Sequence, residues 1–148
     1  MNKYRITIFL AASILVVLLL ACAPAATPPT AAGATVTVTC EQFSQKAHIV
    51  QDVTAAAGST VTVTLCSNPT TGFSWGEQAQ ISNPEVLKQT SHKAVAPANT
   101  GMVGAPGNQV WTFQALKAGA STASFSYSRP WEGGEKDVQT FKLNVTVQ

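Results

Sequence analysis

The chain has 148 residues, of which 45% are hydrophobic and 11% are charged, with 10 glycines, 8 prolines and 3 cysteines. Charged residues are scarce beside the roughly 25% of an average soluble domain. The apolar content nevertheless excludes a disordered chain, because it suffices for a buried core. A polytopic membrane protein is also excluded, since only one apolar run is long enough to matter. The length fits one folded domain, at about 100–200 residues per domain.

Residues 1–21 have the organisation of a secretory signal peptide. Lys3 and Arg5 precede a run from Ile8 to Ala21 that is apolar except for Ser13, and this run is shorter than the roughly 20 residues that span a bilayer. The segment Leu19-Leu20-Ala21-Cys22 at the end of this run resembles a bacterial lipobox, which is cut before its cysteine. The resemblance implies an exported protein with palmitate-type acyl chains on Cys22, anchored to a bacterial membrane on its extracytoplasmic side. An uncleaved membrane anchor is the alternative.

Residues 22–34 form the predicted tether between this lipid and the folded part. After Cys22 the segment has no charge, no large apolar side chain and three prolines. Extended at about 3.1 Å per residue, it would hold a domain roughly 30–40 Å from the bilayer. Loss of Lys3 and Arg5 leaves seven basic side chains against seven acidic ones. No basic surface remains for phosphates, so we expect no nucleic-acid partner and contact with the membrane through the lipid only.

The folded part, residues 35–148, alternates apolar and polar residues, as half-buried strands do. The alternation is strict in 35–39, 60–65, 123–128 and 141–148, and weaker strands are expected in 73–75, 86–95 and 110–116. Gly, Pro and Asn turn signals separate them. About seven short strands with turns every dozen residues predict an all-β fold, an antiparallel β-sandwich. No helix longer than one turn is expected.

Two cysteines remain for a disulfide once Cys22 is acylated. Cys40 and Cys66 each follow a Val/Thr strand, so a bridge between the first two strands is plausible in an exported protein. Cys66 is out of phase with Val61, Val63 and Leu65, which a β-bulge could accommodate. The pairing therefore stays open at this point.

Nothing in the sequence predicts an enzyme, a metal site or a cofactor. Gly72-Phe73-Ser74-Trp75-Gly76 matches the nucleophile elbow Gly-x-Ser-x-Gly, but that motif needs a preceding strand, a following helix and a larger α/β fold. His48 and His92 are isolated and have no Cys-x-x-Cys to complete a zinc site. Gly101-x-x-Gly104-x-x-Gly107 lacks the strand, helix and lysine of a phosphate loop. We expect no catalytic residue.

Three connections between strands are more elaborate than reversals require: residues 68–73, 99–107 and 128–132. In a sandwich these three loops can meet at one end, as they do in antibody variable domains. Arg and Trp in the third loop are residue types that dominate binding hot spots, although packing at a sheet edge with the guanidinium on the ring would also explain them.

The three loops resemble those of the chagasin family of cysteine-protease inhibitors over about residues 60–148. The residues concerned are Asn68-Pro69-Thr70-Thr71-Gly72-Phe73, Gly101-Met102-Val103-Gly104 and Arg129-Pro130-Trp131. The resemblance implies an immunoglobulin-like sandwich that reversibly inhibits papain-type cysteine peptidases. It implies that the first loop enters the active-site cleft, with Thr70 and Thr71 beside the catalytic cysteine, and that the other two loops grip its sides. Nothing in the sequence suggests more than a monomer.

A second class of function stays open. The same sandwich could be a lipid-anchored immunoglobulin-like binding or adhesion domain with no protease target, because fold alone does not give function. Such a domain would need no particular sequence in residues 68–73.

Overall fold

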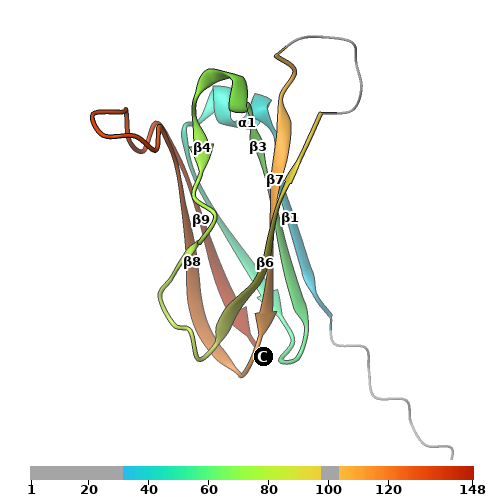
Figure 1. Cartoon of the computed structure of the whole chain (residues 1–148). Helices are drawn as coiled ribbons and strands as arrows, with labels where there is room; N and C mark the ends of the chain where they lie inside the picture. Colours follow the sequence, from blue (N-terminus) through green and yellow to red (C-terminus); the bar gives the residue numbers. More distant parts are fainter. Residues whose placement is uncertain (1–31, 98–103) are drawn as a thin grey trace, which may run out of the picture.

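The computed structural model describes residues 32–97 and 104–148, which form a two-layered β-sandwich (Figure 1). Its strands are β1 (Ala34–Val38), β2 (His48–Ala55), β3 (Thr60–Ser67), β4 (Ser74–Trp75), β5 (Gln80–Ile81), β6 (Leu87–Val95), β7 (Gly107–Ala115), β8 (Gly119–Ser128) and β9 (Gln139–Val147). One sheet has the order β1-β3-β7-β6 and the other the order β2-β9-β8-β4, with β5 also paired to β8. The predicted sandwich is confirmed. The predicted signal peptide and the predicted tether up to residue 31 lie outside the described residues.

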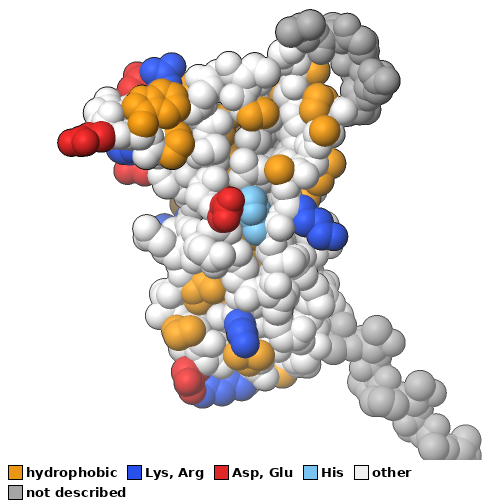
Figure 2. All heavy atoms as spheres, viewed as in Figure 1, with side chains coloured by type: hydrophobic (Ala, Val, Ile, Leu, Met, Phe, Trp, Pro, Cys, Tyr) orange, Lys and Arg blue, Asp and Glu red, His pale blue; other side chains and the backbone are white. Residues whose placement is uncertain are grey.

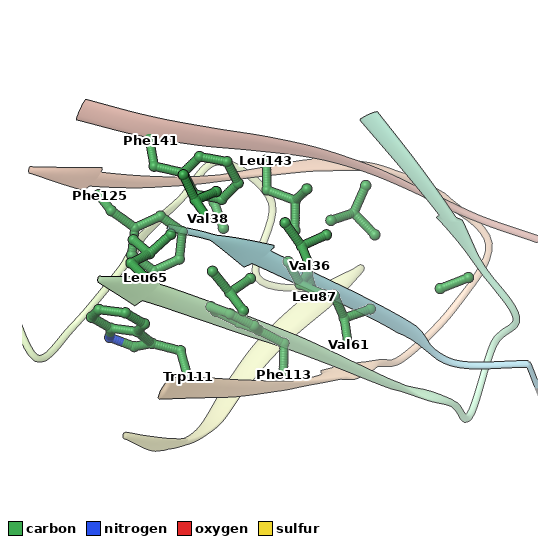
Figure 3. Packing of buried hydrophobic residues seen from close by; sticks show 14 of the residues in the cluster. Val36, Val38, Val61, Leu65, Leu87, Trp111, Phe113, Phe125, Phe141 and Leu143 are labelled. Atoms are coloured by element: carbon green, nitrogen blue, oxygen red, sulfur yellow. The ribbon is translucent and has the colours of Figure 1, made fainter. Parts of the chain in front are cut away.

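The core lies between the two sheets and comes from the alternating residues of the predicted strands. Val61 and Leu65 of β3 meet Phe125 of β8 and Leu143 of β9 across the interface (Figure 3). Trp111 and Phe113 of β7 are fully buried. Burial of each such side chain contributes about 1.5–3 kcal/mol, so these strands hold the sandwich together.

The expectation of a purely antiparallel sandwich is wrong, because two pairings are parallel. β1 pairs in parallel with β3, from Ala34 opposite Val61 to Val38 opposite Leu65. β2 pairs in parallel with β9 along its whole length. Since β1 and β2 belong to different sheets, the chain crosses between the layers there and adds each strand to an edge. Alternation predicts a strand, but it says nothing about its neighbour or direction.

The expectation of no helix longer than a turn is also wrong. α1 (Cys40–Gln45) follows β1 directly, and its Phe43 is buried. Thr39 caps it: its Oγ1 accepts a hydrogen bond from Gln42 N at 3.2 Å, and Gln42 Oε1 accepts one from Thr39 N at 2.8 Å. This capping box starts the helix where the alternation of β1 ends. No helix within residues 32–97 and 104–148 has the length and apolar character to cross a membrane.

A disulfide joins Cys40 to Cys66, with 5.2 Å between their Cα atoms. Cys40 is the first residue of α1 and not part of a strand, so its position in the alternation of β1 has no bearing on the bridge. Cys66 lies near the end of β3, where Leu65, Cys66 and Ser67 are all buried. The bridge therefore connects α1 to the end of β3, and no bulge is needed.

Candidate functional site

The predicted loops emerge from one end of the sandwich, the upper end in Figure 1, together with α1. The register shows the same arrangement, because Ser67 is opposite Gly107, Val95 is opposite Asn108 and Ser74 is opposite Ser128. The connections β3–β4, β6–β7 and β8–β9 therefore all begin at this end. β1 begins, and β9 finishes, at the opposite end.

The first loop is a folded turn. Pro69–Thr71 form a single turn of 3-10 helix, in which Thr71 N donates to Asn68 O at 3.2 Å and Gly72 N donates to Pro69 O at 3.1 Å. Pro69 fixes its own φ at the first helical position. Gly72 ends the turn at φ 78°, a conformation that glycine adopts readily. The residues at its tip, Pro69, Thr70 and Thr71, are exposed.

Asn68 fixes this turn to two other segments. Its side-chain Oδ1 accepts hydrogen bonds from Thr70 N at 3.2 Å and from Thr70 Oγ1 at 2.6 Å. Its Nδ2 donates to Gly104 O at 3.0 Å, which links the first loop to the second. Its backbone N donates to the hydroxyl of Tyr127 at 2.9 Å, and that hydroxyl donates to Asn68 O at 3.3 Å. The side chain of Asn68 thus joins the first loop to the second, and its backbone joins the first loop to the end of β8.

The third loop packs on the first through stacked side chains. The guanidinium of Arg129 lies 4.4 Å from the ring centre of Phe73 and 5.8 Å from that of Trp131, within the range of cation–π attraction. Trp131 reaches Gly72 so closely that a Cβ there would lie 2.8 Å from its Cη2. Glycine at 72 thus serves both the turn and the close approach of the indole.

The β8–β9 connection is itself held in a defined conformation. Arg129 Nη1 lies 3.1 Å from Glu135 Oε2 in an ion pair, and Arg129 N donates to Glu135 O at 2.8 Å. Lys136 Nζ donates to Arg129 O and to Trp131 O. A Cβ on Gly134 would lie 2.7 Å from Arg129 Cβ. Trp131 is thereby presented from a constrained loop although 52% of its surface is exposed.

The structure brings together most of the predicted binding residues. Asn68, Thr70, Thr71, Gly72, Phe73, Gly104, Arg129 and Trp131 contact one another directly or through one neighbour. Pro69 and Pro130 are exposed at the tips of their loops. On the face seen in Figure 2, apolar side chains gather with acidic and basic ones over the β8–β9 connection. Gly101, Met102 and Val103 lie outside the described residues.

Two residues of this end were not among the predicted site residues. Tyr127 lies in the predicted strand 123–128, and its hydroxyl near the end of that strand was the available signal. Gly134 allows the close approach of Arg129 and lies just outside the predicted loop 128–132. Tyr127 supports Asn68 by hydrogen bonds, and Gly134 leaves room for Arg129.

The sandwich has no catalytic setting at the elbow-like sequence. Ser74 belongs to β4, a two-residue strand that follows a 3-10 turn and leads to β5, not to a helix. His48 and His92 are on different sheets, and His92 stacks on Trp111 at 5.0 Å. Within the described ranges, no three His, Cys, Asp or Glu residues are grouped as metal ligands. The hydrogen bond and charge of Lys117 lower the pKa of Glu85, and this pair lies at the opposite end.

A sandwich that displays constrained loops, one of them with an exposed tryptophan, defines a loop-based binding protein. Residues 54–145 match the profile of the chagasin family peptidase inhibitor I42. The chain belongs to this family, which makes it a peptidase inhibitor and not an enzyme. It is 33% identical over 99 residues to chagasin of Trypanosoma cruzi, covering 66% of this chain and 90% of chagasin. It is 32% identical over 88 residues to amoebiasin-2 of Entamoeba histolytica, covering 60% and 70% of the two chains.

Solved structures give the same fold. The crystal structure of the cysteine protease inhibitor EhICP2 from Entamoeba histolytica matches with a TM-score of 0.59 at 23% identity, covering 78% of this chain and 97% of that one. The structure of PbICP-C in complex with falcipain-2 matches with a TM-score of 0.54 at 19% identity, covering 76% and 98%. The expected immunoglobulin-like architecture is confirmed.

Proposed function

We propose that the protein reversibly inhibits papain-family cysteine peptidases by placing the loop end of the sandwich in the active-site cleft. The first loop, residues 68–73, enters the cleft, and residues 99–107 and 128–132 contact its two sides. The observation that carries this proposal is the direct attachment of the exposed 69–71 turn to both neighbouring loops through Asn68 and Gly72. PbICP-C, which shares the fold, is described in complex with falcipain-2.

The conformation of the first loop explains how it can occupy the cleft without being cut. Peptides recognised by main-chain hydrogen bonds are extended, whereas Pro69–Thr71 are coiled into a 3-10 turn. The carbonyls of Asn68 and Pro69 already accept hydrogen bonds from Thr71 N and Gly72 N. Because the backbone of residues 69–71 is coiled, the turn does not offer the catalytic thiolate a peptide bond in the extended conformation of a substrate.

Rigidity of the loops favours tight binding. A loop that is already ordered loses little conformational entropy on docking, and this cost is about 0.5–1.5 kcal/mol for each immobilised side chain. The hydrogen bonds of Asn68 and the stacking of Arg129 on Phe73 order these side chains in the free protein. We propose further that the protein acts as a monomer.

A titration of papain tests the proposal. Increasing amounts of the purified protein are added to papain at fixed concentration, and hydrolysis of a fluorogenic peptide is followed. We expect a stoichiometric loss of activity that returns on dilution, with the inhibitor intact by mass spectrometry. Unchanged papain activity at micromolar excess, repeated with two cathepsin-type peptidases, would contradict it.

We further propose that the mature protein is a lipoprotein anchored through Cys22 to the extracytoplasmic side of a bacterial membrane, with residues 1–21 removed, 22–34 as tether and 35–148 as inhibitor domain. The support is the lipobox-like sequence together with the direction of the chain: β1 starts at the end of the sandwich opposite the loops. An anchor before β1 would leave the loops pointing away from the bilayer.

Replacement of the acylated cysteine tests the anchor. Wild type and Cys22→Ala are expressed in a bacterium that processes lipoproteins, and membranes are separated from soluble protein. Wild type should fractionate with membranes and take up labelled palmitate, and the variant should do neither. Equal membrane association of the two proteins would mean that the anchor is not the lipid.

A further inference from the structure

A row of aromatic rings connects α1 to the first loop. The ring centres of Phe43 and Trp75 are 5.2 Å apart, those of Trp75 and Tyr127 are 4.9 Å apart, and those of Tyr127 and Phe73 are 5.6 Å apart. Each distance lies within the 4.5–7 Å range of favourable aromatic pairs. We call these four residues the aromatic row. It leads from the helix, through β4 and β8, to the last residue of the proposed binding loop.

Polar or covalent bonds hold the aromatic row at α1 and, through Tyr127, beside the first loop. At the α1 end, the Cys40–Cys66 disulfide holds the helix to β3, and Trp75 Nε1 donates to Cys66 O at 2.8 Å. At the loop end, the Tyr127 hydroxyl accepts a hydrogen bond from Asn68 N and donates one to Asn68 O. Trp75 thus contacts Tyr127, and Tyr127 is hydrogen-bonded to the residue that caps the 69–71 turn.

The packing between α1 and the first loop is partly open. An open pocket of about 370 Å³ lies at this end of the sandwich, with Cys40, Phe43 and Ser44 on the side of α1 and Asn68, Thr71 and Tyr127 on the side of the loop. Direct packing between α1 and the turn is interrupted there. Phe43 itself is only 3% exposed and stacks on Trp75.

We propose that α1 is a positioning element for inhibition, with Phe43 as its positioning residue. Phe43 and the disulfide fix Trp75, Trp75 fixes Tyr127, and Tyr127 holds Asn68 in the conformation that docks. This inference rests on the proposed function, and it adds a segment that precedes residue 54, where the family match begins. Without the phenyl ring, Trp75 and Tyr127 gain room, and the loop must be ordered at the moment of binding, which weakens affinity.

The test compares Phe43→Leu with Val147→Ala in the otherwise unchanged protein. Leucine keeps an apolar side chain but removes the ring, whereas Val147 is a buried residue of β9 at the opposite end. Val147→Ala thus reports what a loss of core packing alone does. Two quantities are measured well below the unfolding temperature: the inhibition constant for papain, and the hydrogen exchange of the Thr71 and Gly72 amides, which are bonded within the turn.

We expect Phe43→Leu to raise the inhibition constant about tenfold, because preorganisation is lost, and to accelerate exchange at Thr71 and Gly72. Val147→Ala should leave both near the wild-type values. Equal exchange at these amides in the two variants would overturn the inference, whatever the inhibition constants. If the wild type does not inhibit papain but exchange responds to Phe43→Leu alone, the proposed function fails while the positioning role stands.

A double variant without the disulfide tests the covalent part of the element. Papain needs thiol reductants for activity, so binding is measured by calorimetry with carboxymethylated papain in their absence. Cys40→Ser combined with Cys66→Ser should bind more weakly and show the same faster exchange as Phe43→Leu. Wild-type affinity and wild-type exchange in the double variant would show that the disulfide does not position the loop.

Discussion

Trp131 is the residue on which the proposed interface depends most. Its ring is more exposed than buried, yet it is held by Arg129 on one side and by Gly72 on the other. An exposed aromatic ring that is already ordered gains buried area on binding without a large entropic cost. Arg129, by contrast, is engaged by Phe73, Trp131 and Glu135. In the free protein its contacts join the first loop to the loop that carries the tryptophan.

Trp131→Ala should weaken inhibition of papain by at least about 2 kcal/mol, or roughly 30-fold, as for a hot-spot residue. Its effect on stability should be within about 0.5 kcal/mol, as for most surface substitutions. Inhibition constants and thermal unfolding give the two numbers. The control is Val50→Ala, since Val50 is also an exposed apolar residue but lies on β2. It should change neither the inhibition constant nor the stability. An unchanged inhibition constant for Trp131→Ala would remove this residue from the interface.

Gly72→Ala should impair both the loop and the packing of Trp131. The left-handed φ costs about 1–3 kcal/mol for a residue with a side chain, and the added Cβ would lie 2.8 Å from the indole. Gly58 is the matched control, because its φ of 81° is similar but no atom lies within 4 Å of an added Cβ. Gly58→Ala should destabilise through the backbone alone and leave inhibition unchanged.

The steric part of the Gly72 effect can be isolated by a double-mutant cycle in denaturant unfolding. If the methyl group collides with the indole, Gly72→Ala will cost less stability in a protein that also carries Trp131→Ala. Strictly additive free energies would mean that the two residues do not press on each other.

Among the elements, the first loop depends on Asn68 for its shape and for its link to the second loop. Asn68→Ala removes the cap of the 3-10 turn and the hydrogen bond to Gly104 O. We expect a loss of affinity for papain of about tenfold, because a cap contributes about 1 kcal/mol and the loop loses its order.

Asn68→Asp separates the two roles. The carboxylate still accepts from Thr70 N, but it cannot donate to Gly104 O. Exchange of the Gly72 amide should stay near the wild-type rate in Asn68→Asp and rise in Asn68→Ala, while both variants lose affinity. Full affinity in Asn68→Asp would show that the link to Gly104 is not used in binding.

The disulfide contributes to the stability of the sandwich as well as to the position of α1. Its half-cystines are 26 residues apart, and the chain-entropy relation gives about 3–4 kcal/mol for such a loop. Cys40→Ser combined with Cys66→Ser should lower the free energy of unfolding by about that amount. Denaturant unfolding without reductant measures it; an equal free energy in the two proteins would mean that the bridge does not stabilise the fold.

The elements also show what the sequence could and could not predict. Strict alternation predicted β3, β8 and β9, because each buries one face along its whole length. β2 was not predicted, since Val50 is 56% exposed and obscures the pattern of an edge strand. α1 has only six residues, too few for a helical period, and only the capping box at Thr39 marks it.

The candidate site was predictable as motifs but not as contacts. The residue types of Asn68-Pro69-Thr70-Thr71-Gly72-Phe73 indicated a stiff loop. The hydrogen bond from Asn68 to Gly104, the hydroxyl of Tyr127 and the stack of Arg129 on Phe73 depend on strands far apart in the chain. Local patterns carry no information on such partners, so the positioning residues became visible only in the folded structure.

At the scale of the whole molecule, the two ends of the sandwich have separate roles. The end from which β1 begins and at which β9 finishes would face the tether, and the other end displays the loops and α1 (Figure 1). With the proposed lipid anchor before β1, the binding surface would point away from the bilayer. In the positioning role proposed for α1, the aromatic row and the disulfide order the described residues of the loop end.

The proposed function requires that this end of the sandwich occupies the active-site cleft of a papain-type peptidase. The most direct measurement is calorimetric binding to two forms of papain. The open form is inactive papain whose catalytic cysteine is replaced by serine, and the filled form carries a covalent peptidyl inhibitor along its cleft. We predict one-to-one binding to the open form and no detectable binding to the filled form. Equal binding to both forms would place the contact outside the cleft and contradict the account.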